Sequence, residues 1–411
     1  MTLKRELGLF GATMMGLGSI IGTGVFVSLG IAAGVAGPSV VIAIGIAAAV
    51  TTCNALSSAQ LAANHPVSGG TYEYGYRFLK PWLGFAAGWM FLLSKTASAA
   101  TAALGFSGYL LSASGYGSER IAPVAIGVVV LLTAIVWSGI RLSNHVNIAI
   151  VSVTLVSLAV FVAAGAPAVA AERLRAHFDP ASLWHATALM FVAYTGYGRI
   201  ATLGEEVVEP RSTIPRAILL TLAISMAVYG AVAVVAVGAA GAEGLAQATT
   251  EQAAPLEFVS RGFNGPAHAI VAVGAMTAML GVLLNLILGL SRVLLAMGRR
   301  RDMPRATAQV AVAVLTMGAA IGGLAAVGSV KVTWSFSAFA VLIYYAVTNL
   351  AALQLTDDER LYSRWWPRAG LAACLVLAFA VEWQVWASGL GLLAAGLAWH
   401  AVRQRRRPTS A

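Results

Sequence analysis

Charged residues are scarce in this chain of 411 residues. Only 10% of them are Asp, Glu, Lys or Arg, whereas soluble domains carry about 25%. Hydrophobic residues make up 59% of the chain, and its mean hydropathy is +0.82. A water-soluble chain of this length would need far more polar surface. The composition therefore excludes a soluble protein and predicts an integral membrane protein.

Cysteine is almost absent, and the six histidines are scattered. Cys53 and Cys374 lie in separate apolar stretches, so they make no disulfide framework and are expected to pack as small hydrophobic side chains. No histidine spacing is typical of a metal site. No nucleotide-binding loop, nucleophile elbow or catalytic dyad is present. We therefore expect no metal, no cofactor and no enzymatic activity.

Long apolar runs fill most of the chain and predict twelve membrane-spanning helices, since a helix needs about 20 apolar residues to cross a bilayer core. The stretch 369–401 predicts either two short helices split near Glu382 or one bent hairpin. The other ten spans are expected near 8–36, 38–63, 83–113, 120–139, 144–166, 182–204, 214–240, 266–297, 308–327 and 332–355.

Positive charge is distributed unevenly between the loops. The net charge of +10 lies mainly at the ends of apolar runs, which favours the lipid bilayer over nucleic acid as the partner. With a cytoplasmic N-terminus, most of the 26 Lys and Arg residues fall in inner loops and tails. The positive-inside rule then predicts a multi-pass protein of the cell membrane with both termini in the cytoplasm. The basic run 403–407 would lie near anionic lipid.

Two of the expected helices are interrupted by glycine near their middles. The first span contains residues 18–24 (GSIIGTG), and the sixth contains residues 193–198 (AYTGYG). Paired interruptions of this kind are the best sequence indication of the binding site in an inverted-repeat transporter. Close helix packing through small residues is the alternative.

A break at residues 22–24 would expose backbone N–H groups at the start of the second half-helix. These donors and the helix dipole favour an anion such as a carboxylate. Freed carbonyls near Ile20, and near Val192 and Thr195 across the gap, favour a cation such as an α-ammonium. A zwitterion therefore fits the two breaks by charge.

Four motifs, in the same order along the chain, resemble those of the amino acid–polyamine–organocation superfamily of transporters. They are Gly18–Phe26 (GSIIGTGVF), then Pro66–Tyr72 (PVSGGTY) with Gly84–Trp89 (GFAAGW), then Tyr194–Gly198 (YTGYG) with Glu205, Glu206, Pro210 and 214–216 (IPR), and last Ser291–Met297 (SRVLLAM) ending at 302–304 (DMP). The motifs cover the chain to about residue 305, and the remainder agrees only in hydropathy.

This resemblance implies a fold and a mechanism. The fold would be all-α and membrane-embedded, with a leucine-transporter-like, five-plus-five arrangement of two inverted repeats, about 8–166 and 182–355. These repeats make a transport core of residues 1–355. Residues 356–411 would form peripheral helices and a basic cytoplasmic tail. The chain would be a secondary transporter that carries small-molecule amino acids by alternating access.

The resemblance also implies roles at the breaks. Thr23 and Gly24 would bind the substrate carboxylate, and the carbonyls of Ile20, Val192 and Thr195 would bind its amine. Gly22 and Gly196 belong to the same two interruptions. Tyr194 would either gate the substrate or be an ordinary packed tyrosine.

Two positions concern ion coupling. Lys95 lies deep in the third span, where a charge is costly and usually functional. It would either bind a proton or donate to carbonyls of an unwound helix. In some family members a lysine of the fifth helix is thought to take the coupling role, and the matching position here is Thr154. Proton coupling, sodium coupling, exchange and uniport all stay open.

Charges near the inner helix ends are candidates for a cytoplasmic gate of ion pairs, with solvated loop charges as the alternative. These residues are Arg5, Arg199, Glu205, Glu206 and Arg292. Arg199 follows Gly198, where the family often has an acidic residue, and this leans towards neutral amino acids. A cationic amino acid or polyamine carrier is the alternative, and a non-transporting membrane sensor is a weaker one.

Overall fold

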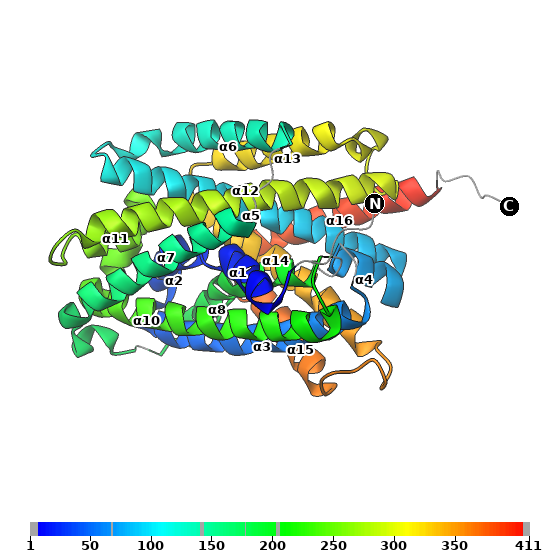
Figure 1. Ribbon diagram of the computed structural model, residues 1–411, viewed down its shortest axis with the longest axis horizontal. Coiled ribbons are helices and arrows are strands. Elements are labelled where there is room, and N and C mark those ends of the chain that lie inside the picture. Colours follow the sequence, from blue (N-terminus) through cyan, green and yellow to red (C-terminus); the bar gives the residue numbers. More distant parts are fainter. Residues whose placement is uncertain (1–6, 67–68, 140–143, 177, 203–205, 406–411) are drawn as a thin grey trace.

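The computed structural model describes residues 7–66, 69–139, 144–176, 178–202 and 206–405. Throughout these ranges the regular structure is helical, apart from an isolated bridge between Leu7 and Val207. Figure 1 shows most long helices running along the long axis of the molecule. The helices are α1 (Leu9–Ile20), α2 (Leu29–Ala36), α3 (Val40–Asn64), α4 (Thr71–Phe78), α5 (Pro81–Ala113), α6 (Ile121–Trp137), α7 (Asn144–Gly165), α8 (Pro180–Tyr194), α9 (Gly198–Ala201), α10 (Pro210–Gln252), α11 (Pro255–Ser260), α12 (Ala267–Arg299), α13 (Val310–Ala325), α14 (Val330–Leu353), α15 (Trp365–Ala378) and α16 (Trp383–Arg405).

Within the described ranges, seven stretches are long and apolar enough to cross a membrane, by length and composition alone. α13 and α15 are shorter apolar helices. Each expected span coincides with a helix or an interrupted helix, while the twelve-span arrangement itself stays a prediction. The seven are Leu9–Asn64, Ser118–Trp137, Asn144–Ala168, Pro210–Gln252, Ala267–Arg299, Val330–Leu353 and Trp383–Arg405.

The structure decides one alternative that the sequence left open, and it differs from the sequence prediction in two further features. The last stretch forms two helices, α15 and α16, on either side of Glu382. The seventh span continues past residue 240 as far as Gln252, through a kink at Gly241 (φ 77°). The short helices α4 and α11 were not expected, because a short helix with polar residues gives no long apolar run.

Local sequence explains where two of the helices begin. Asp179 accepts a hydrogen bond from the backbone N–H of Ser182 (3.0 Å), and Pro180 takes the first helical position of α8. Ser329 accepts from the N–H of Val332 (3.3 Å) at the start of α14. Such side chains satisfy N–H groups that a helix leaves free at its first turn.

Both expected interruptions are confirmed. α1 ends at Ile20, and Ile21 is extended (φ −79°, ψ 102°) before a π-helical turn over Gly24–Ser28 leads into α2. α8 ends at Tyr194 and passes through a 3₁₀ turn into the short helix α9.

The two broken helices pack against each other in opposite directions. α1 contacts α9 and the 3₁₀ turn, whereas α8 contacts α2 and the π-helical turn. The contacts are close because of glycine: a Cβ at Gly24 would lie 2.7 Å from the Cβ of Ala193, and a Cβ at Gly196 would overlap the Ser19 carbonyl oxygen. Glycine therefore serves close packing at both breaks, as the structural alternative expected.

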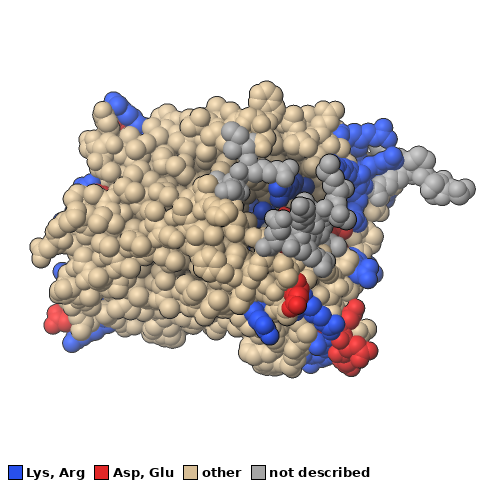
Figure 2. Space-filling model, in the orientation of Figure 1, with Lys and Arg blue, Asp and Glu red and all other residues tan. Residues whose placement is uncertain are grey.

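The face of the molecule drawn in Figure 2 has an uncharged band between two charged ends. Figure 2 shows this band as tan, with Lys and Arg gathered mainly at the end where α4 and the last turn of α16 lie. Large apolar side chains face outward within the band, including Val130 and Leu131 of α6, which are 63% and 60% exposed. Side chains of this kind are stable in contact with lipid and costly in contact with water.

The two cysteines pack as expected. Neither forms a disulfide, and Cys374 is buried with its thiol directed at Asn54 Oδ1 (3.2 Å).

Candidate functional site

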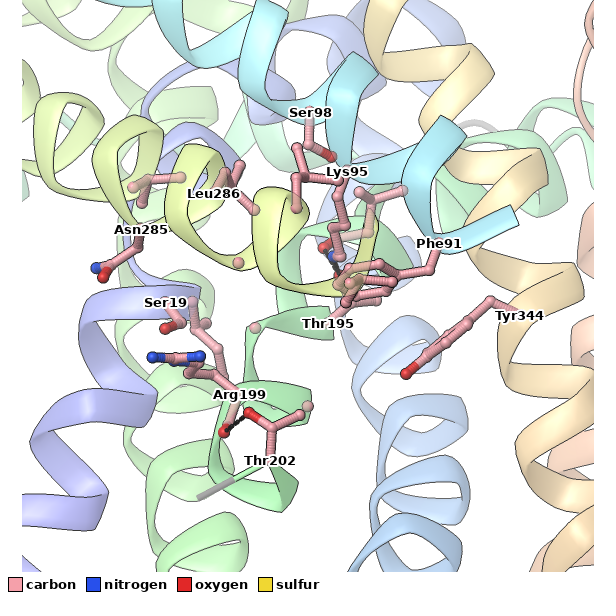
Figure 3. Close-up of a pocket in the computed structure, with 18 of the residues that line it drawn as sticks. Ser19, Phe91, Lys95, Ser98, Thr195, Arg199, Thr202, Asn285, Leu286 and Tyr344 are labelled. Atoms are coloured by element: carbon pink, nitrogen blue, oxygen red, sulfur yellow. Dashed lines mark hydrogen bonds between the residues drawn. The ribbon is translucent and has the colours of Figure 1, made fainter. Parts of the chain in front are cut away.

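A cavity of about 470 Å³ lies where the two broken helices meet. Its volume is within the usual range for small-molecule pockets. The lining residues come from α1, α5, α12, α14 and both interruptions, and Figure 3 shows several of them facing the shared space. On α12 the lining begins at Val282 and continues to Ala296, near the charged end where α4 lies. The cavity therefore runs from the breaks towards that end of the molecule.

The cavity brings together most residues that were predicted to bind substrate. Gly22 and Tyr194 do not line it: a Cβ at Gly22 would face Val282, and the ring of Tyr194 packs 5.0 Å from that of Tyr229. Binding itself stays a prediction. The predicted residues that line the cavity are Ile20, Thr23, Gly24, Val192, Thr195 and Gly196.

The first break presents unsatisfied hydrogen-bond donors. The N–H groups of Val25 and Phe26 both donate to the Gly22 carbonyl (3.1 Å each), so the new helical turn begins at Gly22, and the N–H groups at the start of a helix have no acceptor within it. The hydroxyl of Thr23 is buried and has no partner among the described residues. Buried donors without partners are rare in proteins, so this break has the chemistry to hold an anion.

The carbonyls at the breaks are less available than the sequence suggested. A carbonyl oxygen has two lone pairs. Val192 O already accepts from the backbone N–H and the hydroxyl of Thr195. Thr195 O accepts from Tyr345 Oη (3.0 Å) and from the N–H of Gly198. Ile20 O accepts from Tyr229 Oη (2.7 Å), which leaves one lone pair. In this conformation only Ile20 keeps an acceptor for the predicted amine.

Two tyrosines with clear roles at the breaks were not found from the sequence. Tyr229 of α10 donates to Ile20 O and, at 3.2 Å, to Ala193 O, so it joins both broken helices. Tyr345 of α14 supports the second break. A tyrosine buried in an apolar span must find a hydrogen-bond partner, but the sequence does not show which tyrosine meets which carbonyl.

Lys95 reaches the second break from α5. Its Nζ donates to Thr195 Oγ1 (2.8 Å), as Figure 3 shows. Within the described ranges no carboxylate lies within 4.0 Å of it. The lysine therefore touches a hydroxyl rather than the carbonyls that the structural alternative named, and it also lines the cavity.

Thr154, the other coupling candidate, lies away from the cavity. It is buried in α7 and donates its hydroxyl hydrogen to Ile150 O of the same helix (2.8 Å). Its hydroxyl is thus engaged locally.

The gate candidates converge at the cavity. Arg199, Glu206 and Arg292 all line it, yet no ion pair within 4.0 Å joins any two of them. Glu205 and Arg5 lie outside the described residues. The three described members thus share one space without forming the predicted ion pairs in this conformation.

The buried carboxylate of Asp302 joins several segments at the end of the molecule beside the cavity. The side-chain carboxylate of Asp302 accepts hydrogen bonds from Tyr72 Oη (2.7 Å) and Tyr76 Oη (2.6 Å) of α4. Its backbone carbonyl oxygen accepts a hydrogen bond from the indole N–H of Trp399 in α16 (2.9 Å). Tyr72 also lines the cavity. These hydrogen bonds connect α4 and α16 to the segment after α12.

Among the residues that the structure describes, no group of three or more His, Cys, Asp or Glu is arranged to hold a metal ion.

A bundle of apolar helices whose two broken members face a central cavity defines a membrane transport protein. The chain belongs to the amino acid permease family, whose model matches residues 11–408. It is therefore a multi-pass membrane transporter, and the family implies a small-molecule amino acid substrate.

Similar proteins agree with this assignment. An uncharacterised transporter of Mycobacterium tuberculosis is 45% identical over 98% of this chain and 92% of its own length. A branched-chain amino acid permease of Bacillus subtilis is 30% identical over 75% of this chain and 70% of its own. The cationic amino acid transporter 4 of Homo sapiens is 30% identical over 72% of this chain and 50% of its own.

Proposed function

We propose that the chain is a secondary transporter that moves amino acids lacking a cationic side chain, neutral ones foremost, across the cell membrane. The observation that carries this proposal is the cavity at the two helix breaks. It presents the first N–H groups of the half-helix that begins at Gly22, the Thr23 hydroxyl without a partner among the described residues, and an open lone pair on Ile20 O. These groups are complementary to a carboxylate and an ammonium.

The bound zwitterion would span the two broken helices. Its α-carboxylate would accept from Thr23 Oγ1 and the N–H groups of residues 22–24, with the dipole of the following half-helix in support. Its α-ammonium would donate to Ile20 O. Gly196 lets the two helices approach so that both poles are reached from one cavity. Tyr194 lies behind the lining, so a gating role would require it to move.

The proposed mechanism is alternating access in a five-plus-five inverted repeat. The core would be residues 1–355, with repeats of about 8–166 and 182–355, and residues 356–411 would be peripheral. The antiparallel packing of the broken helices and the excess of Lys and Arg at the α4 end support this arrangement and a cytoplasmic position of both termini. The cavity would then be open to the cytoplasm, and pairing among Arg199, Glu206 and Arg292 would accompany its closure.

For coupling, Lys95 is the proposed centre. When charged it donates to Thr195 Oγ1 at the second break, so loss of its proton would weaken that link and make it easier for the broken helix α8–α9 to shift. The alternative is that transport is coupled to a sodium ion instead of a proton. Thr154 would act only indirectly, because its hydroxyl is bonded within α7.

A carrier of cationic amino acids or polyamines is the second candidate. The similarity to a protein named as a cationic amino acid transporter and the presence of Glu206 in the lining favour it. Against it, Lys95, Arg199 and Arg292 line the same cavity, and a second ammonium would meet like charges in a low dielectric.

The test is uptake into liposomes by the purified chain, with labelled leucine, glutamine, glutamate, lysine and putrescine under imposed proton and sodium gradients. Saturable uptake of an uncharged amino acid above protein-free liposomes supports the proposal. Uptake of lysine or putrescine alone would establish the second candidate. No uptake of any amino acid by a folded preparation would refute transport of this class.

A further inference from the structure

The end of the molecule opposite α4 is covered by the last part of α10 together with α11. After the kink at Gly241, α10 continues to Gln252 and leads through Ala253 (φ 55°) into α11. We call residues 242–260 the α10–α11 corner. Figure 1 shows α11 at the end of the molecule opposite the one where α4 lies. Since α11 contacts the π-helical turn of the first break, the corner covers this break on the side that faces away from α4.

The corner packs closely on the two helices beside it. A Cβ at Gly30 of α2 would overlap Thr249 Oγ1, and a Cβ at Gly108 of α5 would overlap the carbonyl oxygen of Gln252. A second cavity, of about 370 Å³, borders the corner between α2, α6 and the start of α14. The described residues that line it are different from those that line the cavity at the breaks. In this conformation the two cavities are therefore separate.

A buried ion pair joins the corner to the end of α5. Glu257 of α11 is 1% exposed, and its Oε1 lies 2.8 Å from Arg261 Nε. The hydroxyl of Ser112 in the last turn of α5 lies 2.8 Å from Glu257 Oε2 and 2.9 Å from Gln252 Oε1. Arg261 Nη2 donates to this hydroxyl (2.9 Å) and to the Ser112 carbonyl (3.1 Å). Because a buried carboxylate is costly to leave without its partners, these contacts hold the corner on α5.

Tyr109 of α5 connects the corner to the first break. Its side chain is fully buried, and its hydroxyl donates to Phe26 O in the π-helical turn (2.8 Å). The same hydroxyl accepts from the backbone N–H of Leu256 (3.3 Å), the residue before Glu257. The N–H of Phe26 in turn donates to Gly22 O, where the half-helix begins. A rearrangement of this turn would therefore disturb a hydrogen bond that also positions the corner.

We propose that the α10–α11 corner is a second gate of the transporter, held shut by the Glu257–Arg261 ion pair on Ser112 and connected to the first break by Tyr109. The inference rests on the proposed function, since alternating access requires the cavity at the breaks to open in turn to each side. When the first break rearranges, the corner moves away from α5 about Gly241, and the two cavities join. Loss of a contact in the ion-pair cluster then favours the state that is open at this end.

The accessibility of one cysteine from each side of the membrane tests this gate. Asn285→Cys lies in the cavity at the breaks. It would be made in the full chain with Cys53 and Cys374 replaced by serine, and labelled with a membrane-impermeant thiol reagent in right-side-out and in inside-out vesicles. One side is expected to label rapidly and the other, behind the corner, slowly. The slow rate is proportional to the fraction of molecules in which the gate is open.

Glu257→Gln is expected to raise the slow-side labelling rate about tenfold. This is the change in an equilibrium constant that follows from one lost hydrogen bond between charged groups. The glutamine keeps the size of the side chain and can still accept a hydrogen bond from Ser112, so the change removes mainly the ion pair.

Two milder variants and a control accompany it. Ser112→Ala removes one hydroxyl, and Tyr109→Phe deletes the hydrogen bond to Phe26 O without altering the ion pair; both are expected to raise the slow-side rate severalfold. Glu119→Gln is the matched control. Glu119 pairs with Arg120 beside the same end of α5, but both side chains are exposed, so its slow-side rate should equal that of the unaltered chain.

A slow-side rate that stays unchanged in all three folded variants, as judged by gel filtration, would overturn the gate. A rise in Glu257→Gln and Ser112→Ala without one in Tyr109→Phe would overturn the connection to the first break. An equal rise in Glu119→Gln would also overturn the inference, because the effect would then follow from any lost charge. Each of these results leaves the proposed function intact if the unaltered chain carries amino acids into liposomes, whereas uptake of no amino acid would refute that function itself.

Discussion

Tyr229 provides a sensitive test of how the breaks are held. Its side chain is 1% exposed, and its hydroxyl donates to Ile20 O at 2.7 Å and to Ala193 O at 3.2 Å. Tyr229→Phe keeps the ring and its contact with Tyr194 but deletes both hydrogen bonds. The change leaves the buried Ile20 carbonyl without its donor.

An unsatisfied buried acceptor costs about 1–3 kcal/mol. We expect Tyr229→Phe to destabilise the folded protein by about that amount and to weaken substrate binding, because Ile20 O would no longer be held in place. Tyr194→Phe is the matched control. The hydroxyl of Tyr194 is buried without a partner among the described residues, so its removal should leave stability unchanged or raise it.

The measurement is the thermal unfolding midpoint of each purified variant in one detergent, with and without saturating substrate. We expect the lowest unfolding midpoint for Tyr229→Phe. The midpoint of Tyr194→Phe should equal or exceed that of the unaltered chain. If both variants lost the same stability, or if Tyr229→Phe lost none, the hydroxyl would not support the breaks and this reasoning would be wrong.

Three further predictions concern the cavity. Lys95→Met should abolish uptake into liposomes or remove its dependence on an imposed pH gradient, because the link to Thr195 is lost; unchanged uptake at every gradient would make Lys95 a packing residue. Gly196→Ala should prevent folding or transport, since its Cβ would overlap the Ser19 carbonyl, whereas Gly289→Ala, which lines the cavity with no atom within 4 Å of the added Cβ, should yield normal amounts of folded protein by gel filtration. Amino acids with uncharged side chains should compete for uptake at least about tenfold better than lysine, arginine or putrescine, and the reverse order in a competition assay would favour the cationic carrier.

Gly24→Val shows how the structure changes the design of a test. From the sequence, a branched side chain at Gly24 blocks the carboxylate and leaves the fold intact. In the structure the same residue lines the cavity and also packs against Ala193 and the hydroxyl of Tyr229. A loss of uptake in this variant would therefore report on packing as much as on binding. Asn285, which lines the cavity from α12, is a cleaner position for a probe.

The helices and both interruptions were predictable because they depend on local signals. Apolar runs of membrane length mark the spans, and glycine clusters mark the breaks near residues 22–24 and 195–197. Short polar helices such as α4 were not predictable, because they give no long apolar run. The seventh span was predicted to end near residue 240, whereas α10 kinks at Gly241 and continues to Gln252.

Within the site, the sequence pointed to residues but not to their hydrogen-bond partners. Lys95 was recognised by its depth, yet its partner Thr195 lies 100 positions away. The carbonyls of Val192 and Thr195 looked free, and only the three-dimensional structure shows that Tyr345 and Thr195 itself occupy them. Contacts between distant segments depend on tertiary packing, which no local pattern encodes.

If amino acids bind in the cavity between the broken helices, they should protect a cysteine placed there from reaction with a thiol reagent. Asn285 lines the cavity on α12, as Figure 3 shows. Asn285→Cys would be made in a chain whose Cys53 and Cys374 are replaced by serine, and labelled with a membrane-impermeant thiol reagent. We expect this cysteine to react from the cytoplasmic side, and a saturating mixture of the protein amino acids to slow the reaction severalfold. A reaction rate that the amino acids leave unchanged, in a variant that still transports them, would contradict binding in this cavity.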